Sequence, residues 1–162
     1  MNAIKYLLAL ALLLSAGLIW AKGKTKVAPV NKEAPVDIVV NRSPTCTCCG
    51  KWVEHLQSNN FKVKDIVTDD VQAIKDKHGV SKELASCHTA LVNGYIVEGH
   101  VPAADIKKML KAKQPADIIG ITVSQMPSGT PGMEMGGRKD PYQVLSFDKN
   151  NKQQVFSDYP AE

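Results

Sequence analysis

The chain has 162 residues, of which 44% are hydrophobic and 22% are charged, and these values are typical of one globular domain with a sizeable core. The formal net charge is only +4, and the lysines are scattered without interleaved aromatic residues. This balance argues against a nucleic-acid partner, because such binding needs a concentrated basic surface.

A secretory signal peptide is expected at residues 1–21. Lys5 precedes an apolar run from Tyr6 to Trp20, and the small residue Ala21 follows. A basic start, a short apolar middle and a small residue are the parts of such a signal. The run is also shorter than the ~20 residues that span a bilayer comfortably. We therefore expect export to a bacterial periplasm, with membrane attachment only if the segment stays uncleaved as an anchor.

Residues 22–35 contain Lys, Ala and Pro without periodicity, and we expect them to be a flexible tether. Residues 36–158 are expected to form a single domain of alternating strands and helices. The predicted strands cover 36–41, 61–67, 89–92 and 95–101, and the predicted helices end near 59, cover 71–78 and cover 103–111. A crossover between the first two strands, followed by a hairpin at Asn93-Gly94, is typical of a thioredoxin-like α/β fold with a mixed sheet flanked by helices.

The last part of the chain has a different composition. Glycine and proline are too frequent in residues 124–137 for a helix or a central strand, so we expect a long surface loop. This loop carries Met126, Met133 and Met135, and long loops often carry function. Further strands are predicted at 120–123, 142–147 and 153–156, and the last two form a β-hairpin extension.

Three of the four cysteines lie within four residues, at the predicted turn from the first strand to the first helix. They are Cys46, Cys48 and Cys49. Unpaired amides and the helix dipole at such a turn stabilise a thiolate, so we expect lowered thiol pKa values there. The fourth cysteine, Cys87, is remote in sequence, and we expect the fold to bring it back to the other three.

Disulfide pairing is the default for cysteines in an exported protein. Cys48 and Cys49 are adjacent, however, and could pair with each other only with strain. Cys46 and Cys49 form a C-x-x-C pair, so a thiol–disulfide oxidoreductase remains an alternative. The extra thiol of Cys48 and the lack of a proline in residues 84–88 argue against that enzyme. We therefore favour a metal site over a redox-active cysteine pair.

The kind of metal follows from the ligands. Thiolates select Cu(I), zinc and iron–sulfur clusters. Crowded cysteines suit a copper–thiolate cluster in which sulfur atoms are shared between Cu(I) ions, whereas the spacing does not match iron–sulfur motifs. A structural zinc domain stays a second alternative. The predicted copper ligands are Cys46, Cys48, Cys49 and Cys87, and participation is left open for His88, Met126, Met133 and Met135.

These residues resemble the CopG-type periplasmic copper-resistance proteins. The shared motifs are Ser43-Pro44-Thr45-Cys46-x-Cys48-Cys49-Gly50-Lys51-Trp52, Ala85-Ser86-Cys87-His88-Thr89-Ala90, Gly94-Tyr95-x-Val97-Glu98-Gly99-His100-Val101-Pro102 and Met126-Pro127-x-Gly129-x-Pro131-Gly132-Met133-Glu134. The resemblance covers about residues 36–156 and departs from the family at Ser124, where a proline is expected. It implies a thioredoxin-like fold and a cysteine-bridged copper cluster, which binds copper or handles its redox state beside efflux systems.

We therefore predict a periplasmic Cu(I)-binding protein with more than one copper ion. It would sequester, relay or redox-handle copper in copper resistance and homeostasis. The expected partners are copper ions and, beyond them, periplasmic copper chaperones or an efflux system. No catalytic residue is predicted, and, apart from the oxidoreductase alternative, an enzymatic role is left open for the redox handling of copper.

Overall fold

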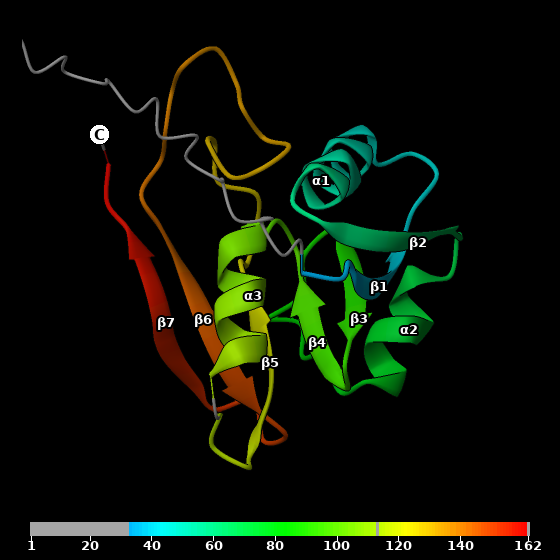
Figure 1. Cartoon of the computed structure of the whole chain (residues 1–162), viewed down its shortest axis with the longest axis vertical. Coiled ribbons are helices and arrows are strands. Elements are labelled where there is room, and N and C mark those ends of the chain that lie inside the picture. The colour runs from blue at the N-terminus through cyan, green and yellow to red at the C-terminus, as the bar shows by residue number, and fades with distance from the viewer. Residues whose placement is uncertain (1–32, 113, 162) are drawn as a thin grey trace, which may run out of the picture. The chain divides into compact units, whose positions relative to one another are not determined.

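The computed structural model describes residues 33–112 and 114–161 of the chain (Figure 1). The predicted signal peptide and the tether up to residue 32 lie outside this part. Its strands are β1 Val36–Arg42, β2 Phe61–Val67, β3 His88–Val92, β4 Tyr95–Glu98, β5 Ile118–Thr122, β6 Tyr142–Asp148 and β7 Gln153–Tyr159. Its helices are α1 Thr47–Ser58, α2 Val71–Lys77 and α3 Ala103–Lys111. The strands join one sheet in the order β2-β1-β3-β4-β5-β6-β7.

The sheet begins with a β1-α1-β2 unit. β1 and β2 pair in parallel, so the chain has to return along the sheet through α1 before β2 starts. The helix buries Trp52, Val53 and Leu56, whose spacing places them on one side of a helix. It ends at Ser58 with Asn59 as the C-cap residue, and Asn60 follows with φ 63°, a left-handed conformation that asparagine tolerates.

A tight hairpin joins β3 and β4. Asn93 and Gly94 have φ 47° and 84°, and positive φ at both central positions is the requirement of a type I′ turn. The turn fixes a register in which Thr89 lies opposite Glu98. β3 also pairs antiparallel with β1, so the hairpin places the residues that precede β3 next to the end of β1.

β4 ends at Glu98, not at the predicted Val101. Gly99 has φ 75°, and a Cβ atom there would lie 2.4 Å from the carbonyl oxygen of Val123. Only glycine permits such a close approach of two backbones, and the chain leaves the sheet here. It then enters α3 directly after Pro102, with the predicted helix bounds.

Both faces of the sheet are covered. Neighbouring residues of β4 point to opposite faces. Val97 packs in a cluster with Trp52 of α1 and Ile106 of α3, whereas Ile96 packs in a second cluster with Leu84, which follows α2. The α/β class, with a mixed sheet flanked by helices, is therefore confirmed, and the more specific thioredoxin-like assignment stays a prediction.

The strands β5, β6 and β7 extend the sheet beyond β4, and β6 and β7 form the predicted hairpin. The described residues 123–141 contain no helix or strand, apart from one isolated bridge between Met135 and Arg138. The buried carboxylate of Asp105 in α3 accepts hydrogen bonds of 2.6 Å from the Ser157 and Tyr159 hydroxyl groups. These bonds fix β7 to α3.

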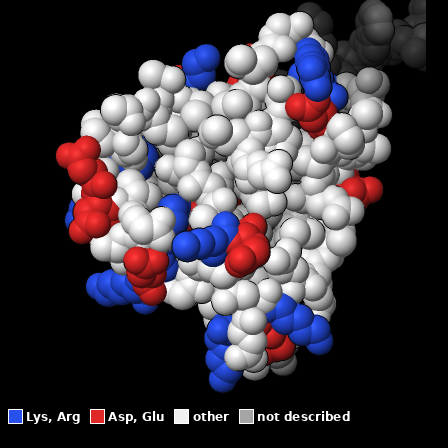
Figure 2. All heavy atoms as spheres, turned by 180° about the vertical axis from the view of Figure 1, so that it is seen from behind, with Lys and Arg blue, Asp and Glu red and all other residues white. Residues whose placement is uncertain are grey.

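The surface carries charges of both signs. On the face seen in Figure 2, acidic and basic side chains are interspersed, and uncharged residues fill much of the centre. The scattered lysines of the sequence predict such a surface. Within residues 33–112 and 114–161, each helix is too short or too polar to cross a membrane.

Candidate metal centre

The cysteine cluster begins where β1 ends and α1 starts. Cys46 is the N-cap residue of α1, and no side chain makes a capping hydrogen bond there. Thr45 instead interacts with Ser43, whose Oγ lies 2.9 Å from the Thr45 hydroxyl and accepts the Thr45 N–H at 3.3 Å. The first turn of α1 therefore presents its amides without a hydroxyl partner, next to the sulfur atoms.

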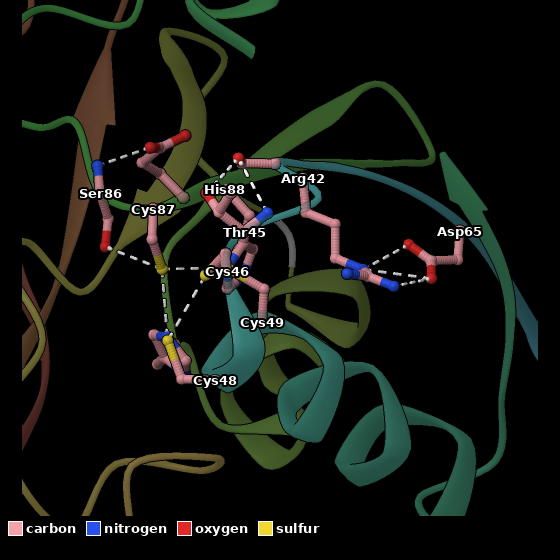
Figure 3. The surroundings of a disulfide bond; sticks show 12 residues. Arg42, Thr45, Cys46, Cys48, Cys49, Asp65, Ser86, Cys87 and His88 are labelled. Carbon is pink, nitrogen blue, oxygen red and sulfur yellow. Dashed lines mark hydrogen bonds and ion pairs between the residues drawn. A yellow bond between two sulfur atoms is a disulfide. The ribbon is translucent and has the colours of Figure 1, made fainter. Parts of the chain in front are cut away.

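The cluster contains one disulfide, between Cys46 and Cys49 (Figure 3). The C-x-x-C spacing of Cys46 and Cys49 left this pairing open as an alternative to a metal site. The two residues are three positions apart across the first turn of α1, and their Cα atoms are 5.4 Å apart, a separation that suits a disulfide. Cys48 and Cys87 are free, and the Cys48 Sγ atom lies 3.4 Å from that of Cys46.

Cys87 lies just before β3, and the antiparallel pairing of β3 with β1 brings it to the start of α1. The Sγ atoms of Cys46, Cys48, Cys49 and Cys87 all lie within 4.8 Å of one another. The structure thus brings together all four cysteines that were predicted as copper ligands. Their role as metal ligands stays a prediction.

Two histidines adjoin the sulfur atoms. Ligand atoms of Cys49, Cys87, His88 and His100 also lie within 4.8 Å of one another. The Cys87 Sγ atom is 3.1 Å from His100 Nε2 and 3.3 Å from His88 Nδ1. From the sequence, metal binding was left open for His88, and His100 was not among the candidate ligands. The hairpin register is the sequence feature that could have identified His100. A turn at Asn93-Gly94 places the residues after β4 beside those before β3.

The histidine rings are held neutral in defined orientations. Burial lowers the pKa of His100, and its Nδ1 donates to the Pro131 carbonyl at 2.7 Å, so Nε2 presents a lone pair towards Cys87. Burial and the neighbouring His100 and Lys75 hold the pKa of His88 far below its ordinary value. The His88 ring also stacks on Trp52 with 4.2 Å between centroids. Neutral imidazole is the form that binds metals.

The pKa of the Cys87 thiol is raised, whereas a lowered pKa was expected for the three cysteines at the helix start. Burial raises the pKa of this thiol to about 11, and the nearby Cys48 raises it too. Cys87 precedes a strand and does not belong to the helix start, so loss of solvation is the dominant influence on its pKa. A metal cation reverses this preference, because it replaces the proton and compensates the thiolate charge.

The loop of residues 123–141 lies against the site. A Cβ atom on Gly132, which has φ 86°, would lie 2.9 Å from both the Cys48 carbonyl oxygen and the Trp52 amide nitrogen. Glycine therefore allows the loop to touch the first turn of α1. Met126 and Met135 are 49% and 62% exposed, which is unusual for large hydrophobic side chains. Their binding of metal stays a prediction.

The fold and the site define an α/β protein with a cluster of soft sulfur and imidazole donors at a strand-to-helix turn. A family model described as "Protein of unknown function, DUF411" matches residues 84–133, which include Cys87, His88 and His100. No curated protein is significantly similar to the chain.

Two solved structures are similar to the chain over nearly their whole length. They are titled copper resistance protein CopG, form 2 and form 1. They have 45% and 46% sequence identity and a TM-score of 0.73, and each match covers 78% of this chain and 99% of the other. The chain belongs to the CopG family of copper resistance proteins.

Proposed function

We propose that this protein binds Cu(I) through Cys46, Cys48, Cys49 and Cys87 and serves copper resistance and homeostasis. The observation that carries the proposal is the convergence of the four Sγ atoms within 4.8 Å. Soft thiolates favour Cu(I) over hard cations, and the similar solved structures are titled copper resistance proteins.

The site would hold more than one copper ion. Its two groups of ligand atoms overlap, because Cys49 and Cys87 belong to both the four-sulfur group and the group with His88 and His100. A thiolate that belongs to two groups can bridge two Cu(I) ions. Bridging also distributes the negative charge of four crowded thiolates over several cations, which favours a cluster over a single ion.

Full loading would require reduction of the Cys46–Cys49 disulfide. Two electrons and two protons from a dithiol reductant convert this disulfide into two thiols, and the reductant becomes a disulfide. Copper then displaces thiol protons, so loading would release protons into the medium. With the disulfide intact, only the thiols of Cys48 and Cys87 remain for the metal, beside the two histidines.

The cellular role follows from the expected export of the chain. In the periplasm, the protein would sequester Cu(I), relay it or change its oxidation state. Copper chaperones or an efflux system would be its exchange partners. The exposed thioethers of Met126 and Met135 lie on the loop that touches the site, and they would be suited to transient contact with Cu(I).

Anaerobic metal titration tests the proposal. Reduced protein should bind more than one Cu(I) per chain against a chromophoric Cu(I) chelator, and the oxidised protein should bind fewer. Cys87→Ser should lower the stoichiometry or affinity of the reduced protein, whereas Ser58→Ala, a change at an exposed position at the far end of α1, should not. One zinc and no copper per chain in reduced protein would instead identify a structural zinc domain.

The disulfide itself supports a second candidate, thiol–disulfide exchange. Cys46 is partly exposed and Cys49 is buried, so an external thiolate could reach Cys46 first. Its attack would form a mixed disulfide and release the Cys49 thiolate, and a second external thiol would complete the reduction. Insulin reduction by metal-free protein, at rates typical of dithiol oxidoreductases, would favour this function over copper binding.

A further inference from the structure

A charged network is buried between α2, β3 and β4, under the segment that carries Cys87. Its side chains belong to Lys75, Thr89 and Glu98, which are 4%, 0% and 0% exposed. The Lys75 ammonium group forms a short ion pair with Glu98 Oε1 and donates to Thr89 Oγ1 at 2.8 Å. The Thr89 hydroxyl donates to Glu98 Oε2 at 2.7 Å. Each carboxylate oxygen therefore has a donor although solvent does not reach it.

The same carboxylate holds the backbone beside Cys87. Glu98 Oε1 accepts the N–H of Ser86 at 2.6 Å. Nearby, the Thr122 hydroxyl donates to the Leu84 carbonyl at 3.0 Å. The segment between α2 and β3 contains no helix or strand, so regular backbone pairing does not hold it. Side-chain hydrogen bonds fix it instead, including one of 2.8 Å from Ser86 Oγ to the Gln125 carbonyl, and the bond from the Ser86 N–H to Glu98 acts on the backbone next to the thiol.

Stability alone does not explain this network. Buried ion pairs are often replaceable by apolar side chains of similar volume without loss of stability, because their desolvation cost offsets their attraction. An apolar pair at Lys75 and Glu98 would leave the Ser86 N–H without its acceptor, however. The feature that such a replacement would lose is the fixed backbone next to Cys87.

We propose that Glu98, oriented by Lys75 and Thr89, is a positioning residue that fixes Cys87 beside the other cysteines. The effect on copper rests on the proposed Cu(I)-binding function, whereas the effect on the backbone exists in the metal-free protein. Mutation of groups that orient metal ligands in this way typically lowers metal affinity by about 10–100-fold.

Two double variants separate positioning from charge. K75M/E98L and K75M/E98Q both remove the ion pair, but the side-chain amide oxygen introduced by E98Q can still accept the Ser86 N–H. We expect K75M/E98L to bind Cu(I) about 10–100-fold more weakly than wild type and to change the thiolate-to-copper absorption bands. K75M/E98Q should recover most of the affinity and the wild-type bands. Equal affinity of the two variants would overturn the proposal.

Amide hydrogen exchange at Ser86 tests the same inference without copper and without a variant. In the metal-free wild type this amide should be protected, although it lies outside helices and strands; exchange as fast as that of an exposed loop amide would overturn the proposal. This measurement decides the matter if K75M/E98L does not fold. Protection at Ser86 in a wild-type protein that fails to bind Cu(I) would refute the proposed function and leave the positioning role standing.

Discussion

The contact between the 123–141 loop and α1 gives the sharpest test of the site, through Gly132→Ala. The new methyl group would lie 2.9 Å from two backbone atoms of α1, which cannot rotate away as a side chain could. The loop must therefore move and would weaken the hydrogen bond between Pro131 and His100. Gly136→Ala is the matched control, because Gly136 also has positive φ, 60°, but nothing lies within 4 Å of its Cβ position.

The two variants differ in the expected loss of stability. Alanine in the left-handed region costs ~1–2 kcal/mol in either variant. Gly132→Ala adds the cost of an unpaired buried group at His100 or Pro131, ~1–3 kcal/mol. We therefore expect the free energy of unfolding to fall by ~1–2 kcal/mol for Gly136→Ala and by ~2–5 kcal/mol for Gly132→Ala.

Denaturant unfolding of the metal-free proteins measures this difference, and chelator competition measures Cu(I) affinity. Only Gly132→Ala should weaken Cu(I) binding, because only this loop movement reaches His100. Equal losses in the two variants would refute the packing of the loop on α1. An unchanged copper affinity of Gly132→Ala would refute the role of the loop at the site.

Two further predictions follow from the buried groups. In the oxidised, metal-free protein, alkylation of Cys87 should be slow near pH 8 and accelerate towards pH 11, because the folded protein keeps this thiol protonated up to a pKa of about 11. The free energy of unfolding should also fall as pH rises from about 9 to 11, since the thiol loses its proton at lower pH in the unfolded chain. Rapid alkylation at pH 8 would contradict this pKa. Trp52→Phe removes the 2.9 Å hydrogen bond to the Val101 carbonyl and should cost ~1–3 kcal/mol of unfolding free energy; a loss under ~0.5 kcal/mol would show that the bond is unimportant.

Most of the secondary structure was predictable, because its signals are local. The apolar spacing of Trp52, Val53 and Leu56 predicts one face of α1, and the structure buries all three. Asn93-Gly94 predicts the β3–β4 turn, and both residues have positive φ. The end of β4 was missed, because the approach of Gly99 to Val123 depends on a strand that comes later in the chain.

The pairing within the cluster was not predictable in the same way. The spacing of Cys46 and Cys49 allowed a disulfide, a metal site or both. The choice of Cys46 with Cys49 became visible only when the first turn of α1 set their Cα separation to 5.4 Å. The raised pKa of Cys87 likewise follows from burial, which the sequence around that residue does not reveal.

The sequence by itself determined the order of the elements, the place of three cysteines at a strand-to-helix turn and the soft character of the donors. These properties depend on residues within a few positions of each other. Only the tertiary structure decided that His100 faces Cys87 and that Glu98 holds the Ser86 backbone. Both contacts join residues more than ten positions apart, and they form only because the β3–β4 pairing places those segments side by side.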